Sequence, residues 1–127
     1  IRWINDSKGT NVGATIAALE GLDRPVVLIA GGQAKTSDFS GLSSALSERA
    51  THLVVFGQDA KHIARSVDAS IGVTQVEQLA QAIDVAAGEA HRGDVILFSP
   101  ACASYDQFDN FEHRGDVFRQ LVKERHA

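Results

Sequence analysis

Three polar segments of the sequence hold the residues that are best suited to chemistry. They are residues 5–11 (NDSKGTN), 31–39 (GGQAKTSDF) and 99–108 (SPACASYDQF). The first two each carry a lysine, Lys8 and Lys35, and the third carries the only cysteine, Cys102. An ammonium group near a helix N-terminus or a glycine-rich turn can bind phosphate or carboxylate. The pattern indicates anion binding, while the cysteine raises the separate question of a nucleophile or a metal ligand.

The first segment combines an acid, a base and helix-capping residues. Asp6 and Lys8 follow an expected strand, and Thr10 or Asn11 would begin the next helix. A helix N-terminus beside a lysine suits an anionic ligand. Ordinary capping with a solvated Asp6–Lys8 pair explains the same residues, so the two interpretations have equal weight.

The second segment resembles part of a phosphate-binding loop but lacks its glycines. The motif G-x-x-x-x-G-K-[ST] needs glycine where this chain has Ile29 and Ala34. No G-x-G-x-x-G stretch is present either. Gly31 and Gly32 still allow a tight turn that brings the backbone near a ligand and leaves Lys35 to reach an anion. A plain surface turn explains the segment at least as well.

The third segment places Cys102 among small residues after Pro100, which would end a strand. His113, the nearest histidine, is eleven residues further on, and no cysteine–histidine spacing fits a zinc site. No G-x-S-x-G nucleophile motif is present. We therefore expect Cys102 to be a small buried apolar residue, and we predict no catalytic residue and no metal ligand in this chain.

The elements that must position these segments alternate along the chain. Continuous Val, Ile and Leu runs predict buried strands at residues 25–30, 51–57, 69–73 and 94–100, after a first strand at 1–6. Apolar residues at helical spacing predict helices at residues 11–22, 40–50, 59–67, 74–90 and 117–127. In the helix over 74–90, Thr74 and Glu77 would form a capping box.

This alternation predicts an α/β fold, an open and mainly parallel sheet with helices on both faces. Ligands of such sheets bind beyond the carboxyl ends of the strands. Each of the three polar segments follows a predicted strand. We therefore expect the segments to meet at one edge of the sheet.

Composition narrows the classes of function. The chain has 127 residues, 44% of them hydrophobic, which fits a single domain with one core. A net charge of −4 without a basic stripe argues against nucleic acid as a partner. No stretch approaches the roughly 20 apolar residues that cross a bilayer, so we expect no membrane insertion. A single cysteine and the lack of a secretory signal indicate the cytoplasm.

Three stretches resemble, in order and spacing, the C-terminal domain of the Mur ligase family, and within it the ligases that add D-glutamate to UDP-N-acetylmuramoyl-L-alanine. They are WINDSKGTNVGATIAAL, LIAGGQAKTSDFS and LFSPACASYDQFDNFEHRGDVF. The resemblance covers essentially all of residues 1–127 and implies a Rossmann-like domain. Family members also have an N-terminal domain that binds the uridine nucleotide and a central ATPase domain. We expect both to be absent here, because the chain begins without methionine, as an excised domain would.

The resemblance implies an ATP-dependent ligase that forms a peptide bond in peptidoglycan precursor synthesis. Family members use ATP and Mg²⁺, bound mainly by the central domain, to phosphorylate the alanyl carboxylate, which the amine of D-glutamate then attacks. The implied partners are D-glutamate, UDP-N-acetylmuramoyl-L-alanine, ATP and the other two domains of the same chain. This domain would position D-glutamate and close over ATP, and it would be inactive in isolation.

Matching positions within the resemblance assign roles to individual residues. Asp6 and Lys8 match the family's contacts to ATP, where the carboxylate suits ribose hydroxyls and the ammonium group suits phosphate. The positions that match D-glutamate contacts are Thr10, Lys35, Ser104, Tyr105 and Phe111. The DNPR motif of the sister ligase that adds a diamino acid is absent, which favours D-glutamate. The alternative is a stand-alone, non-catalytic α/β module that binds a small anion or a partner protein.

Overall fold

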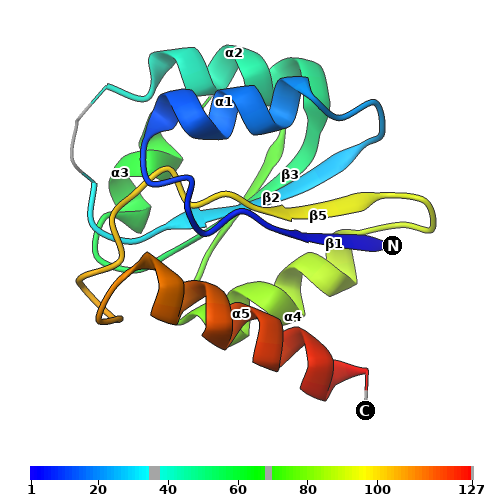
Figure 1. Ribbon diagram of the computed structural model, residues 1–127. Coiled ribbons are helices and arrows are strands. Elements are labelled where there is room, and N and C mark those ends of the chain that lie inside the picture. Colours follow the sequence, from blue (N-terminus) through cyan, green and yellow to red (C-terminus); the bar gives the residue numbers. More distant parts are fainter. Residues whose placement is uncertain (35–37, 68–69, 127) are drawn as a thin grey trace.

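Five parallel strands form one sheet within the residues that the computed structural model describes, 1–34, 38–67 and 70–126 (Figure 1). The spatial order is β1-β5-β2-β3-β4. The strands are β1 (Arg2–Asn5), β2 (Val26–Gly31), β3 (Ala50–Phe56), β4 (Gly72–Gln75) and β5 (Val95–Phe98). The helices are α1 (Val12–Glu20), α2 (Ser40–Arg49), α3 (Ala60–Arg65), α4 (Leu79–Glu89) and α5 (Phe111–Arg125). No helix in these residues is long and apolar enough to cross a membrane. The predicted α/β fold is confirmed.

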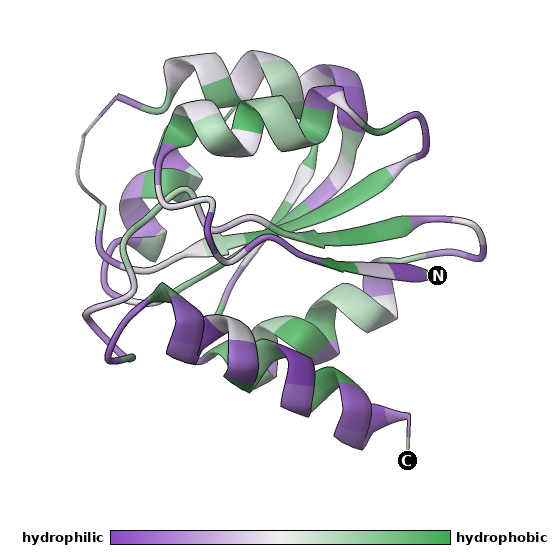
Figure 2. Ribbon diagram, in the orientation of Figure 1, coloured by the Kyte–Doolittle hydropathy of each residue, from purple (hydrophilic) through white to green (hydrophobic). Residues whose placement is uncertain are grey.

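Strand β2 lies at the centre of the sheet, and all six of its residues are buried. Leu28 and Ala30 belong to the core under α1, α2 and α3, whereas Val27 and Ile29 belong to the core over α4 and α5. Figure 1 shows these two sets of helices on opposite faces of the sheet. The central strands are the most continuously hydrophobic part of the ribbon (Figure 2). A strand covered on both faces needs apolar residues at successive positions, which explains why this run shows no alternation.

The course of the chain explains why one sheet edge collects three loops. From β1 the chain reaches β2, β3 and β4 in turn, moving across the sheet in one direction with α1, α2 and α3 on one face. It then returns through α4 on the opposite face to β5, which lies between β1 and β2. A reversed direction places the helix on the other face when every crossover has the same hand. Helix α5, which follows β5, also lies on this second face, whereas α1 and α2, which follow β1 and β2, lie on the first face. Ligands of α/β sheets bind where neighbouring strands lead to helices on opposite faces.

The prediction of a helix over 74–90 is wrong in its first part. Strand β4 extends into this range, and α4 starts only after it. The capping box uses Gln78 and Gln81 rather than Thr74 and Glu77. Thr74 lies in β4 instead, because the β-branched side chains at this point fit a pleated strand better than a helix.

Helix α5 is longer than the predicted helix over 117–127. Asn110 is its N-cap, and the Asn110 Oδ1 atom accepts a hydrogen bond of 2.7 Å from the amide of His113. The first residues of the helix, FEHRGD, lack an apolar stripe, so helical spacing did not reveal them. Gly115 is nevertheless buried, and a Cβ atom at this position would lie only 3.1 Å from the Cβ atom of Ser7. The helix therefore packs its first turns against the loop after β1.

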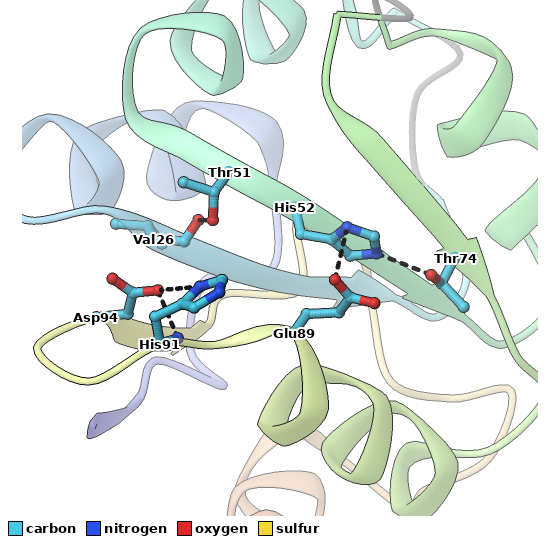
Figure 3. A network of polar contacts seen from close by, with 7 residues as sticks. All are labelled: Val26, Thr51, His52, Thr74, Glu89, His91 and Asp94. Atoms are coloured by element: carbon cyan, nitrogen blue, oxygen red, sulfur yellow. Dashed lines mark hydrogen bonds and ion pairs between the residues drawn. The ribbon is translucent and has the colours of Figure 1, made fainter.

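Polar contacts near the amino ends of the strands link β3, β4 and the end of α4 (Figure 3). The His52 ring of β3 places Nε2 2.8 Å from Thr74 Oγ1 of β4 and Nδ1 3.7 Å from Glu89 at the end of α4. Asp94, just before β5, accepts a hydrogen bond of 2.8 Å from the amide of His91 and closes the turn after α4. These contacts fix the edge strand and the helix ends on the side of the sheet away from the three polar loops.

Replacing Thr74 by valine keeps the β-branched shape and removes the hydroxyl that partners His52. We expect the free energy of unfolding to fall by about 1 kcal/mol, the usual net value of a hydrogen bond. The matched control is Thr51→Val, because Thr51 is exposed and its hydroxyl lies 3.4 Å from the Val26 carbonyl. That variant should change stability by no more than about 0.5 kcal/mol. Urea denaturation measures both, and equal losses would contradict the role of the His52–Thr74 contact.

Candidate functional site

The loops after β1, β2 and β5 meet at the carboxyl edge of the sheet, as predicted. The Ala101 amide donates a hydrogen bond of 2.8 Å to the Gly9 carbonyl, which joins the loop after β5 to the loop after β1. On the other side, Gln33 and Ala103 exchange two backbone hydrogen bonds of 2.9 Å. The loop after β5 thus lies between its two neighbours and is bonded to both.

Small buried residues make this close approach possible. Ala101, Cys102, Ala103 and Ser104 have exposed fractions of at most 6%. Ala101 has a φ angle of 63°, a left-handed conformation that is uncommon for a residue with a side chain. A Cβ atom at Gly32 would collide with the Ala103 carbonyl oxygen. Strained backbone of this kind persists only where its surroundings enforce it, and it is concentrated at ligand sites.

The carboxylate of Asp6 is held by the loop after β5. The hydroxyl of Ser99 donates a hydrogen bond of 2.8 Å to Asp6 Oδ2, and the same oxygen of Ser99 lies 3.0 Å from Thr15 Oγ1. Among the contacts of the described residues, no ion pair joins Asp6 to Lys8. Asp6 is therefore fixed by a neutral donor, while the exposed Lys8 extends into solvent.

An open cleft of about 740 Å³ begins beside Asp6 and runs along α1. Its polar end is lined by Asn5, Asp6, Lys8 and Gly9. Its other lining residues are apolar: Ile4, Ala14, Ala17, Ala18, Leu22 and Leu97. An apolar cleft with one carboxylate and one ammonium group at its rim can hold a ligand with a flat apolar part, hydroxyls and an anionic group.

Arg114 of α5 is completely buried behind these loops. Its Nη2 and Nε atoms donate hydrogen bonds of 2.7 and 3.1 Å to the carbonyl and the hydroxyl of Ser7. Its Nη1 atom donates one of 2.9 Å to the Cys102 carbonyl. Burial lowers the pKa of Arg114 to about 10, so the guanidinium stays protonated at neutral pH. The Phe98 ring lies 5.8 Å from the guanidinium carbon, and no carboxylate of the described residues pairs with it.

Two further carboxylates bind main-chain amides around the loop after β3. Asp59 Oδ2 accepts a hydrogen bond of 2.7 Å from the Ala34 amide, and Asp106 Oδ2 accepts one of 2.9 Å from the Gln58 amide. Sequence reasoning missed Asp59 and Asp106, as it missed Arg114. Spacing along the chain does not distinguish a charged residue that bonds to a loop from one that is solvated.

The structure brings several of the predicted site residues together. Asp6, Lys8 and Thr10 share the loop after β1, and Ser104 lies in the buried turn after β5. Asn11 rather than Thr10 caps α1, because Asn11 Oδ1 accepts a hydrogen bond of 2.9 Å from the Ala14 amide. The Thr10 side chain is therefore not the helix cap.

The remaining predicted site residues differ in exposure. Tyr105 and Phe111 are 69% and 42% exposed, which is unusual for large apolar side chains, and they flank the turn and the start of α5. Lys35 lies outside the described residues. In the part of the chain that is described, no group of three or more His, Cys, Asp or Glu side chains could hold a metal ion.

Comparison with known proteins places the chain in a family. The family model described as "Mur ligase, glutamate ligase domain" matches residues 1–102, from β1 into the loop after β5. The chain belongs to the Mur ligase family. The match includes the loops that carry Asp6 and Lys8, whereas α5 with Arg114 lies beyond the matched residues.

Curated Mur ligases resemble this domain over nearly all of its length. Proteins of Idiomarina loihiensis, Chromohalobacter salexigens and Chlamydia felis are 50%, 49% and 43% identical over 97%, 96% and 100% of the chain. Each is named "UDP-N-acetylmuramoylalanine--D-glutamate ligase". The chain covers only 27%, 28% and 30% of these proteins, so it spans between a quarter and a third of their length.

Cys102 is fully buried, which confirms its predicted packing role, and burial raises the pKa of its thiol from 9.0 to about 12.

We expect the folded domain to react with a thiol reagent such as iodoacetamide at pH 8 at least about 100-fold more slowly than the urea-unfolded chain. Because the raised pKa belongs to the folded state, its contribution to stability is complete below pH 9 and is lost as the pH rises toward 12. Equal alkylation rates of the folded and unfolded chain would contradict this placement.

Proposed function

We propose that this Mur ligase domain is the C-terminal domain of a ligase that joins D-glutamate to UDP-N-acetylmuramoyl-L-alanine in peptidoglycan precursor synthesis. The observation that carries the proposal is the meeting of the loops after β1 and β5, which hold most of the matched ATP and D-glutamate positions, at one sheet edge. The name that the relatives share supports the choice of substrate. An N-terminal domain for the uridine nucleotide and a central ATPase domain would complete the enzyme, which we place in the cytoplasm.

The loop after β1 would cover the outer side of ATP. A carboxylate such as Asp6 accepts hydrogen bonds from ribose hydroxyls, and its link to Ser99 fixes its orientation before the nucleotide arrives. Lys8 is exposed beside it and can reach a phosphate as a mobile point charge. Both residues line the polar end of the cleft along α1.

The turn after β5 would meet D-glutamate, which has two carboxylates and one amine. Ser104 is 2% exposed and is held in the turn, so its position is set before binding. Thr10 approaches from the loop after β1, and the exposed rings of Tyr105 and Phe111 can cover the methylene groups of the ligand. Lys35 completes the proposed set, because its match in the family engages a glutamate carboxylate. Charge-assisted contacts of this kind contribute about 1.5–3 kcal/mol each.

In the proposed reaction, this domain orients the substrates and forms no covalent bond with them. A carboxylate oxygen of the uridine-linked substrate attacks the γ-phosphorus of ATP and ADP leaves. The D-glutamate amine then attacks the activated carbonyl carbon, loses a proton, and phosphate leaves. We assign Mg²⁺ to the central domain, since the described residues here offer no group of three ligands. The contribution of this domain is the placement of the amine and of nearby charge.

Lys35→Ala in the full ligase tests the D-glutamate assignment. Loss of one charge-assisted contact, about 1.5–3 kcal/mol, should raise the KM for D-glutamate about 10- to 100-fold and leave the KM for ATP within about twofold. Lys8→Ala should show the opposite pattern, because its ammonium is assigned to the nucleotide. Steady-state kinetics with each substrate varied in turn measures both.

Lys123→Ala is the matched control, because it removes the same charge from the last turn of α5, remote from the three loops. It should leave both Michaelis constants unchanged. Unchanged constants in all three variants would overturn the site assignment. If the protein is expressed without the other two domains and has no ligase activity in any assembly, the non-catalytic anion-binding module is the better description.

A further inference from the structure

Arg114 makes contacts that extend beyond its own helix to both sides of the proposed site. The Ser7 carbonyl and hydroxyl accept two of its N–H groups, and Ser7 lies between the two residues assigned to ATP, Asp6 and Lys8. The Cys102 carbonyl accepts a third, two residues before Ser104 in the turn assigned to D-glutamate. One planar group thus connects the loop after β1, called the ATP loop below, with the turn after β5, called the D-glutamate turn.

Stability alone gives little reason to hold a cation at this position. Arg114 is in the first turns of α5, where the helix dipole disfavours positive charge. It is 0% exposed and forms no ion pair with a carboxylate of the described residues. Burial lowers its pKa, and the more distant Asp106 is the only carboxylate that raises it against this effect. Replacing buried charged groups by apolar ones of similar size is often neutral or stabilising. A residue that departs from local rules in several ways is expected at a functional site.

The geometry of the guanidinium makes the link rigid. Nε and Nη2 both donate hydrogen bonds to Ser7, so the plane of the guanidinium is fixed relative to the loop after β1. The Ser7 hydroxyl in turn donates a hydrogen bond of 2.7 Å to the Phe111 carbonyl at the start of α5. Gly115 lets the helix approach, since a Cβ atom there would lie 3.1 Å from the Cβ atom of Ser7. The ATP loop, the D-glutamate turn and the start of α5 are therefore connected by hydrogen bonds and close packing.

We propose that Arg114 is a positioning residue that sets the distance between the ATP loop and the D-glutamate turn by bonding to Ser7 and Cys102 together. The inference rests on the proposed function, because it gives a role to the spacing between two proposed half-sites. Reactants must be held within a fraction of an ångström of productive geometry, and a displacement of about 1 Å can cost about 100-fold in rate. Loss of Arg114 should affect both substrates, whereas loss of a direct contact affects one.

The test compares variants in the full ligase by steady-state kinetics and urea denaturation. Arg114→Lys keeps the positive charge but cannot form the fork of bonds to two loops. We expect it to raise the KM for ATP and the KM for D-glutamate together, each at least about fivefold, with a lower kcat. Arg114→Met removes the charge as well and should raise them further.

A stability-matched control separates positioning from general loosening of the fold. Phe118→Leu weakens the packing of α5 against Phe98, because the Phe98 and Phe118 rings stack with centroids 4.6 Å apart. It removes none of the hydrogen bonds that join Arg114 to Ser7 and Cys102. At an equal loss of unfolding free energy it should leave both Michaelis constants within about twofold. Arg119→Lys, on the exposed side of the same helix, should change neither activity nor stability.

Ser7→Ala provides a second route if the Arg114 variants fold poorly. It removes the hydroxyl that bonds Arg114 Nε, and its effect on the KM for ATP should be strongly non-additive with that of Arg114→Lys. Unchanged Michaelis constants in Arg114→Lys, the same rise in Phe118→Leu, or additive effects with Ser7→Ala would each overturn the inference. Lys8→Ala and Ser104→Ala test the proposed function separately. If neither raises the KM of its assigned substrate, the proposed function fails whatever Arg114 does.

Discussion

A single buried cation that is bonded to neutral groups constrains the whole carboxyl edge of this domain. A guanidinium in a dry environment needs its N–H groups paired, because an unpaired buried charge is strongly unfavourable. The acceptors for Arg114 come from the loop after β1 and the loop after β5, so both loops must stay in place together.

The sheet provides the rigid base on which this arrangement stands. Because β5 returns to a place between β1 and β2, its loop emerges between theirs, and both neighbours are within hydrogen-bonding distance. The central strands are buried on both faces, so their ends have little freedom to move. Small residues and Gly32 then let the loops touch through main-chain groups, and the Lys8 side chain stays exposed beside them.

The sequence predicted the strands and the position of the loops better than it predicted the side-chain contacts within the site. The buried strands and the meeting of three loops followed from uninterrupted apolar runs, and the packing role of Cys102 followed from the lack of a nearby histidine in the sequence and of zinc-site spacing. The start of α4 was missed, because a Thr–Glu pair resembles a capping box even where tertiary pairing makes a strand. Arg114 was missed for a different reason. In a charged helical stretch, one arginine turned inward has the same local pattern as its solvated neighbours, and only the tertiary structure distinguishes them.

Native-state hydrogen exchange followed by NMR tests most directly whether the three loops form one unit. The Gly31 amide at the end of β2 donates a hydrogen bond to the Pro100 carbonyl in the loop after β5. From that loop, the Ala101 and Ala103 amides donate hydrogen bonds to the Gly9 and Gln33 carbonyls of the two neighbouring loops. If the loops are joined as described, these amides exchange only through the large openings that also expose the core amide of Leu28, with protection within about tenfold of it. Exchange of all three at the rate of an unstructured peptide, while Leu28 stays protected, would contradict a preorganised site.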